Sequence, residues 1–122
     1  WNTSNVTDMS FMFNRAEHFN QPLNKWNTSK VTNMCSMFRM ARYFNYPVNN
    51  WDTSQVTNMS YMFCETLCFN QPLNSWNTSN LTDMRYIVGE TYSFEYLDSL
   101  DNWDISKLTH LESLKFCDAD WE

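Results

Sequence analysis

The chain has 122 residues, of which 43% are apolar and 17% aromatic, with a formal net charge of −6; this length suits one domain with its own hydrophobic core. The negative charge argues against a nucleic-acid partner, because affinity for a phosphate backbone comes largely from Lys and Arg. No apolar run approaches the ~20 residues that cross a bilayer, so the sequence predicts no membrane span.

A fixed repeat organises the chain. A Trp opens every copy, and we number each copy from that Trp as position 0. The copies are residues 1–25, 26–50, 51–75, 76–102 and 103–122. Repetition at such a period is typical of a solenoid, in which each unit buries its apolar face only by stacking on its neighbours. We therefore expect four solenoid repeats, followed by a degenerate fifth that acts as a C-terminal cap.

The first half of each copy predicts a short helix. Apolar side chains recur at positions 5, 8, 11 and 12, which are Val31, Met34, Met37 and Phe38 in the second copy. Steps of three and four residues follow the helical template. Thr with Asp or Asn at positions 6 and 7 predicts an N-cap, because such side chains accept hydrogen bonds from the amides of a first turn. We expect one to two turns of helix over positions 8–14.

The second half of each copy predicts a short strand. It contains FNQPLN at 19–24 and again at 69–74, and FNYPVN at 44–49. Pro cannot donate to a strand ladder and favours the first residue of a strand, so we expect a strand just after each of these prolines. The predicted fold class is an α/β repeat: a right-handed, leucine-rich-repeat-like solenoid with one short parallel strand and one short helical turn per 25-residue coil.

Asn recurs at positions 19 and 23, as in Asn20, Asn45 and Asn70. Equivalent amides in stacked coils can bond one another, which would satisfy the polar groups of an irregular turn. We expect these three residues to be structural rather than ligand-binding.

The segments VTNMSYMF at 56–63 and FNQPLNSW at 69–76, combined with the constant period, resemble the BspA-like leucine-rich-repeat surface proteins. More narrowly, they are similar to the Trp- and Met-containing repeat class of unknown function in that family. The resemblance covers residues 1–76 closely. It implies a parallel, slightly curved solenoid on an exposed cell surface, used in adhesion or protein binding, and it implies no catalytic residues.

No residue pattern indicates catalysis, a cofactor or a metal. Cys64 and Cys68 form a C-x3-C pair without a nearby His, whereas structural zinc normally takes four Cys or His ligands. Neither His18 nor His110 has an evident partner that would orient it as a base. We expect neither enzyme activity nor a bound cofactor or metal ion.

Aromatic residues at variable positions are the candidate partner-binding residues, because Tyr is broad, rigid and amphipathic and is favoured at recognition surfaces. They are Phe11, Tyr43, Tyr46, Tyr61, Tyr86, Tyr92 and Tyr96. Three of them share position 10 and predict a stripe across the coils. The alternative is that each covers an edge of the core singly, since scattered exposed apolar residues are normal.

The predicted function is that of a non-enzymatic, surface-exposed repeat module that mediates protein binding or adhesion outside the cell. The alternative is a structural subunit or segment docked inside a larger macromolecular assembly. Because the chain opens on Trp1 rather than Met, we expect it to be a piece of a longer protein. If a eukaryote secretes it, Asn5 and Asn80 are the candidate glycosylation acceptors, because their sequons occupy a variable position.

Overall fold

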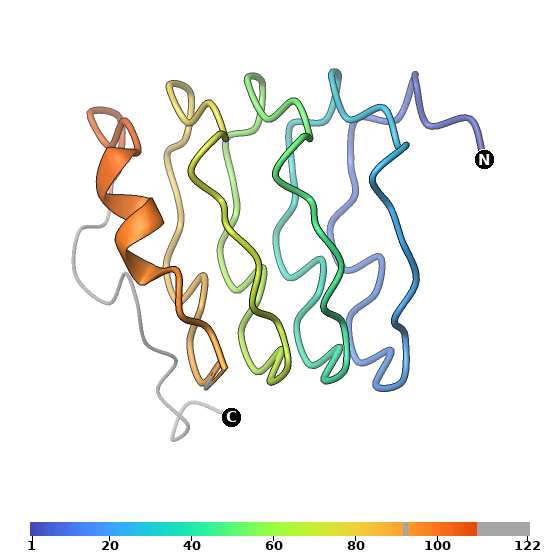
Figure 1. The fold of residues 1–122 in the computed structure, drawn as a ribbon. Helices are drawn as coiled ribbons and strands as arrows, with labels where there is room; N and C mark the ends of the chain where they lie inside the picture. Colours follow the sequence, from blue (N-terminus) through green and yellow to red (C-terminus); the bar gives the residue numbers. More distant parts are fainter. Residues whose placement is uncertain (92, 110–122) are drawn as a thin grey trace.

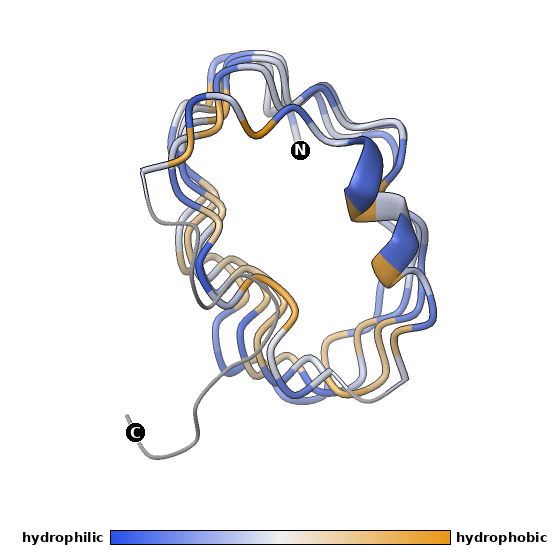
Figure 2. Ribbon diagram, turned by 90° about the vertical axis from the view of Figure 1, so that its left-hand side faces the viewer, coloured by the Kyte–Doolittle hydropathy of each residue, from blue (hydrophilic) through white to orange (hydrophobic). Residues whose placement is uncertain are grey.

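A computed structural model describes residues 1–91 and 93–109. Figure 1 shows consecutive coils standing side by side along one axis, and Figure 2, which looks along that axis, shows them superposed around a common interior. Side chains from every coil fill this interior as one core. Those of the second coil include Val31, Met34, Met37, Phe38, Phe44 and Val48.

The predicted secondary structure is wrong. Within the described ranges the one helix is the 3₁₀ helix η1 (Leu97–Asn102), in the copy that is two residues longer. β-pairing in the same ranges is limited to isolated parallel bridges, which join Asp8 to Asn33, Asn33 to Asn58, and Asn58 to Asp83. The chain is therefore not an α/β repeat with a strand and a helical turn in each coil. Apart from η1, the described coils consist of turns and extended segments.

Left-handed backbone excludes the predicted helix. Positions 10 and 14 of the first four coils have φ between 54° and 63°, whereas a helix requires φ near −60° throughout. In the second coil these residues are Ser36 and Met40. The amide of Met37 donates to the carbonyl of Met34 (3.2 Å), and the amide of Ala41 donates to that of Phe38 (2.9 Å). A positive φ at the third residue of each such turn is the pattern of a type II turn.

Alternate amides of this segment donate to the neighbouring coil. The amides of Met34, Ser36, Phe38 and Met40 donate to the carbonyls of Asn58, Ser60, Met62 and Cys64 at 2.8–3.0 Å. The same four positions make the equivalent bonds from the first coil to the second and from the third to the fourth. Backbone groups that a helix would pair within itself are thus paired between coils, which satisfies them inside the core.

Turns also explain why the apolar spacing resembled that of a helix. A turn closed by a bond between residues three apart brings the chain back to the interior every three or four residues. Met34, Met37, Phe38 and Ala41 are consequently all fully buried. The expected N-cap is an Asx turn instead, because the Asn33 side chain accepts from the amide two residues later.

A tight turn replaces the strand predicted after each proline. The amide of Trp51 donates to the carbonyl of Val48 (3.1 Å), and the same bond recurs in the other copies. Because the chain reverses there, Val48 and Trp51 both reach the core although they are three residues apart. The indole nitrogen of Trp51 then donates to the carbonyl of Leu23 (3.0 Å), which lies one repeat before Val48.

Columns of equivalent side chains join successive coils. The Phe38 ring lies between those of Phe13 and Phe63, with centroids 5.6 and 5.5 Å away. The structural role expected for Asn at position 19 is confirmed, because the Asn20 and Asn45 side chains accept from the amide of the equivalent residue in the next coil (3.0 and 2.8 Å). The cap predicted for residues 103–122 falls mostly outside the described part of the chain and stays a prediction.

Relieving one left-handed residue should stabilise the chain. Arg15 is exposed and has φ 63°, a conformation that costs an L-residue about 1–2 kcal/mol and Gly very little. Relief of this strain raises the free energy of unfolding, whereas the larger backbone entropy of Gly in the unfolded chain offsets part of the gain. We therefore expect Arg15→Gly to raise the free energy of unfolding by up to about 1 kcal/mol. Arg15→Ala keeps the strain and serves as the matched control. Urea denaturation that finds Gly no more stable than Ala at this position would contradict the left-handed assignment.

Candidate functional site

The candidate site is a groove of about 640 Å³ that crosses the first three coils. Its walls are Pro22, Asn24, Tyr46, Pro47, Asn49 and Asn50, and Ser75 lies at its far end. We call it the Pro-Tyr groove. Its lining residues occupy positions 20 to 24 of their coils, and the equivalent segment of the fourth copy forms η1. None of its lining residues carries a charge.

Core contacts on either side of Tyr46 hold the groove in place. The half-buried Tyr46 packs against the hydrophobic core. Phe44, two residues earlier, is fully buried and stacks between Phe19 (5.8 Å) and Phe69 (6.0 Å). Pro47 fixes its own backbone φ, and Val48 after it is fully buried. The Tyr46 ring is therefore presented from a rigid backbone.

Two of the groove's amide side chains are held by the scaffold. The Asn49 nitrogen donates to Asn74 Oδ1 (3.3 Å) and Ser75 Oγ (3.2 Å), while its oxygen accepts from the Ser75 amide (3.0 Å). The Asn50 nitrogen donates to the carbonyl of Asn24 (2.7 Å). The Asn49 bonds join the second coil to the third, and the Asn50 bond joins the second coil to the first.

Other polar groups of the groove are open to a ligand. Within residues 1–91 and 93–109, the Asn24 side chain and the Tyr46 hydroxyl make no hydrogen bond to the chain. The Ser75 hydroxyl accepts from Asn49 and keeps its own proton to donate. The groove thus combines apolar ring surfaces with a few hydrogen-bonding groups, a combination typical of binding sites.

The predicted aromatic residues do not form one patch. Tyr46 lines the groove, whereas Tyr43 is 50% exposed and stacks on His18 with centroids 5.4 Å apart. Tyr96 is 39% exposed and lies tilted against Phe94 (6.3 Å). Tyr92 lies outside the described residues.

The stripe predicted at position 10 is interrupted. Tyr61 and Tyr86 lie together, with centroids 5.1 Å apart, and the Arg39 guanidinium lies 5.1 Å from the Tyr61 centroid. Between them and the exposed Phe11, position 10 is the buried Ser36. In place of a continuous stripe, the chain forms a pair of aromatic rings, Tyr61 and Tyr86, with the Arg39 guanidinium beside Tyr61.

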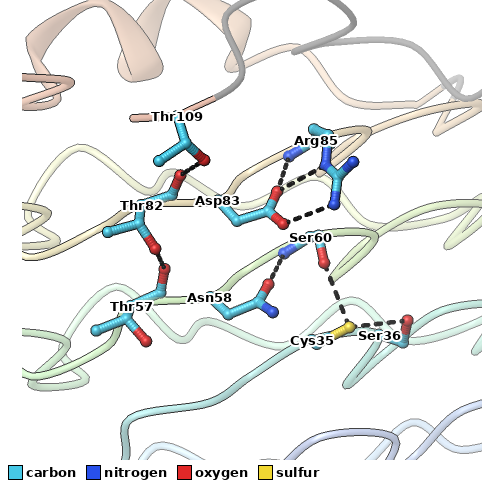
Figure 3. A network of polar contacts seen from close by, with 9 residues as sticks. All are labelled: Cys35, Ser36, Thr57, Asn58, Ser60, Thr82, Asp83, Arg85 and Thr109. Carbon is cyan, nitrogen blue, oxygen red and sulfur yellow. Dashed lines mark hydrogen bonds and ion pairs between the residues drawn. The ribbon is translucent and has the colours of Figure 1, made fainter. Parts of the chain in front are cut away.

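A network of polar contacts joins residues at positions 6 to 10 of the second to fifth coils (Figure 3). Asp83 holds Arg85 through two oxygens, with Nη2–Oδ2 at 2.9 Å, and this contact raises the pKa of Arg85. The Ser60 hydroxyl donates to the sulfur of Cys35 (3.3 Å). These contacts tie neighbouring coils or turns together, so we assign this network to the scaffold.

The two candidate glycosylation residues are both exposed but differ in the hydrogen bonding of their side-chain amide nitrogens. Asn80 Nδ2 donates to the Ser54 carbonyl at 2.7 Å. Among the described residues, the Asn5 side chain bonds through its oxygen alone, which accepts from Lys30 Nζ at 3.2 Å. Because a glycan is attached to the amide nitrogen, Asn5 is the better placed acceptor of the two.

The described residues hold no group of three or more His, Cys, Asp or Glu side chains that could bind a metal ion together. The same residues include no helix that is long and apolar enough to span a membrane. Of the residues that line the Pro-Tyr groove, the sequence pattern indicates only Tyr46 as a candidate binding residue. The prolines and most of the asparagines lie in the recurring Phe-Asn-x-Pro-x-Asn segment, which by itself predicts only the start of a strand.

We expect low pH to weaken the turn that contains Asp52 and Ser54, and we expect Asp52→Asn to remove this sensitivity to acid. Both the hydroxyl and the amide of Ser54 donate to the Asp52 carboxylate, which lowers its pKa below the ordinary 3.8. A carboxylate whose pKa is lowered by folding stabilises the chain above its unfolded pKa, and this contribution is lost as the pH falls through the folded pKa. Asp52→Asn keeps the acceptor oxygen, as Asn27 does at the same position of the second coil.

We therefore expect Asp52→Asn to lose less stability than wild type between about pH 5 and about pH 2, measured as the change in urea midpoint. The Asp8 and Asp104 carboxylates, whose pKa values are lowered in the same way, remain in both proteins. Identical pH profiles would show that the Asp52 turn contributes nothing in its charged form.

Residues 1–103 match a family described as "Mycoplasma protein of unknown function, DUF285". No curated protein and no solved structure gives a significant match.

Proposed function

We propose that this chain, which belongs to the DUF285 family, is a non-enzymatic repeat module that binds another protein through the Pro-Tyr groove. The observation that carries the proposal is the groove itself: three ring side chains, Pro22, Tyr46 and Pro47, on a backbone held by the core. Rigid rings lose little conformational entropy when a partner covers them, which is why Tyr is common at interfaces. The open Asn24 amide and Tyr46 hydroxyl would orient the partner.

An unbiased selection tests this function. Random peptides displayed on phage are selected on the immobilised chain, and each binder is then measured against Tyr46→Ala, Pro22→Ala and Tyr43→Ala. We expect binders whose affinity falls about tenfold or more with the first two variants, which truncate groove walls. Tyr43 is more exposed than Tyr46 but lies outside the groove, so Tyr43→Ala should leave the affinity within about twofold. A selection that yields no binder, or only binders indifferent to both groove variants, would overturn the proposal.

The repeats' resemblance to BspA-like surface proteins supports a further part of the proposal, that the module is displayed at the cell surface and acts in adhesion. Protease treatment of intact cells that produce the protein tests this placement. Cleavage of the chain before any cytoplasmic marker is cut would agree with it, and full protection would contradict it.

A segment docked inside a larger assembly is the second candidate function, and the first coil favours it. Met12 is 39% exposed there, whereas the equivalent Met37 and Met62 are fully buried by neighbouring coils. A docked partner would cover this apolar surface. Sedimentation of the native protein separates the two functions: a particle much heavier than one chain, in which Met12 is protected from oxidation, would favour the assembly. A monomer with an oxidisable Met12 would favour the binding module.

A further inference from the structure

We propose that the occupant of the Pro-Tyr groove is an uncharged, proline-rich segment of the partner protein in the polyproline II conformation. This inference rests on the proposed function and specifies its ligand. It follows from three properties of the groove: the shape of its apolar walls, the kind of hydrogen-bonding group left open, and the lack of charge.

The walls suit pyrrolidine rings. Pro22, Pro47 and the ring of Tyr46 give the groove flat, rigid apolar surfaces. Aromatic surfaces in grooves bind polyproline II segments because the ligand is already extended and loses little entropy on binding, and Tyr46 supplies such a surface here. The coils that build the walls repeat every 5.8–6.0 Å along the Phe19, Phe44 and Phe69 column. Three coils therefore advance by about 12 Å, the length of about four residues that rise 3.1 Å each in polyproline II.

The open polar groups include three donors. The Asn24 nitrogen, the Tyr46 hydroxyl and the Ser75 hydroxyl can all donate, whereas the nitrogens of Asn49 and Asn50 are already used within the chain. Donors need acceptors, and polyproline II leaves every backbone carbonyl unpaired. Proline also brings no N–H of its own, so it places no unpaired donor in the groove.

The groove's neutrality excludes ligands that are recognised by charge. No Lys, Arg, Asp or Glu is among its lining residues, so neither a phosphorylated nor an acidic segment would find a counter-charge there. A charged side chain would lose its hydration without compensation. Among protein segments, a neutral run of prolines meets all three conditions.

Titration of the ¹⁵N-labelled chain with acetylated hexaproline amide tests the proposal. We expect saturable shifts of the Asn24 side-chain amide and of the Tyr46 and Ser75 backbone amides, with a Kd of about 1 mM or below. Tyr46→Ala should weaken binding at least about tenfold. Tyr46→Phe keeps the ring and the fold and loses only the hydroxyl, so it should weaken binding about threefold to tenfold. Tyr43→Ala should leave the affinity within about twofold.

Three results would overturn the inference: no shift at about 10 mM hexaproline, equal binding of a Gly-Ser hexapeptide, or equal hexaproline affinity of the wild type and Tyr46→Phe. Maltohexaose, titrated in parallel, reports on the other ligand class that stacks on Tyr; if it shifts the groove amides and hexaproline does not, the groove is a carbohydrate site. The phage selection separates the two proposals. Groove-dependent binders without proline would leave the proposed function standing and remove this inference alone.

Discussion

Replacing Phe38 by Ala is expected to lower the free energy of unfolding by about 3–5 kcal/mol, a large fraction of the stability of an ordinary domain. Phe38 is fully buried, and its ring lies 5.6 Å from Phe13, 5.5 Å from Phe63 and 4.2 Å from Phe44. Truncation removes the contacts with both neighbouring coils at once. The turn backbone, fixed by bonds between coils, leaves little room for collapse into the cavity.

The chain supplies its own controls for this substitution. Position 12 of the fourth coil is Val88, which is also buried, so Phe38→Val should cost clearly less than Phe38→Ala. Phe11 is 55% exposed, and Phe11→Ala should change the free energy by no more than about 0.5 kcal/mol. Equal losses for Phe38→Ala and Phe11→Ala in urea denaturation would refute the stacked Phe column.

Deleting residues 35–59 is expected to leave a folded, shorter stack. The deletion joins Met34, at position 8, to Ser60, at position 9, so every later residue keeps its position in the coil. The bonds from alternate amides then reach the next coil as before. Loss of one coil removes one set of contacts between coils, so the unfolding midpoint should fall while the transition stays cooperative.

Deleting only residues 36–59 retains Cys35, so this variant has one more residue within the type II turns than the variant that lacks 35–59. Every amide after Cys35 then shifts by one position, so the amides that should donate to the next coil face the wrong way. We expect no cooperative unfolding transition from this variant, by near-UV circular dichroism or by Trp fluorescence. A variant lacking 36–59 that unfolds as cooperatively as the one lacking 35–59 would show that the register of these turns is unimportant.

The sequence was sufficient to predict the columns of equivalent side chains in the core. Equal spacing of Trp and Phe placed each column, and the recurrence of Asn20 and Asn45 predicted their bonds between coils. Backbone conformation was not predictable in the same way. Met34, Met37 and Phe38 are spaced for a helix and for a chain of turns alike, and periodicity cannot separate the two.

Left-handed residues at Ser36 and Met40 decide between these conformations, and their identity gives no signal. Turn positions with positive φ normally carry Gly or Asn, yet the chain places Phe, Ser, Tyr, Arg, Met and Glu there. The groove was hidden for a related reason. Its walls come from three coils, so Pro22, Tyr46 and Ser75 become neighbours only when the register of stacking is known.

Hydrogen-bond scalar couplings measured by NMR on the ²H,¹³C,¹⁵N-labelled chain test the alternation of bonds within and between coils most directly. The fold described here predicts a coupling between the Phe38 amide nitrogen and the Met62 carbonyl carbon, and another between the Ser36 nitrogen and the Ser60 carbonyl. A coupling from the Phe38 nitrogen to the Met34 carbonyl, the bond of an α-helix, would contradict it.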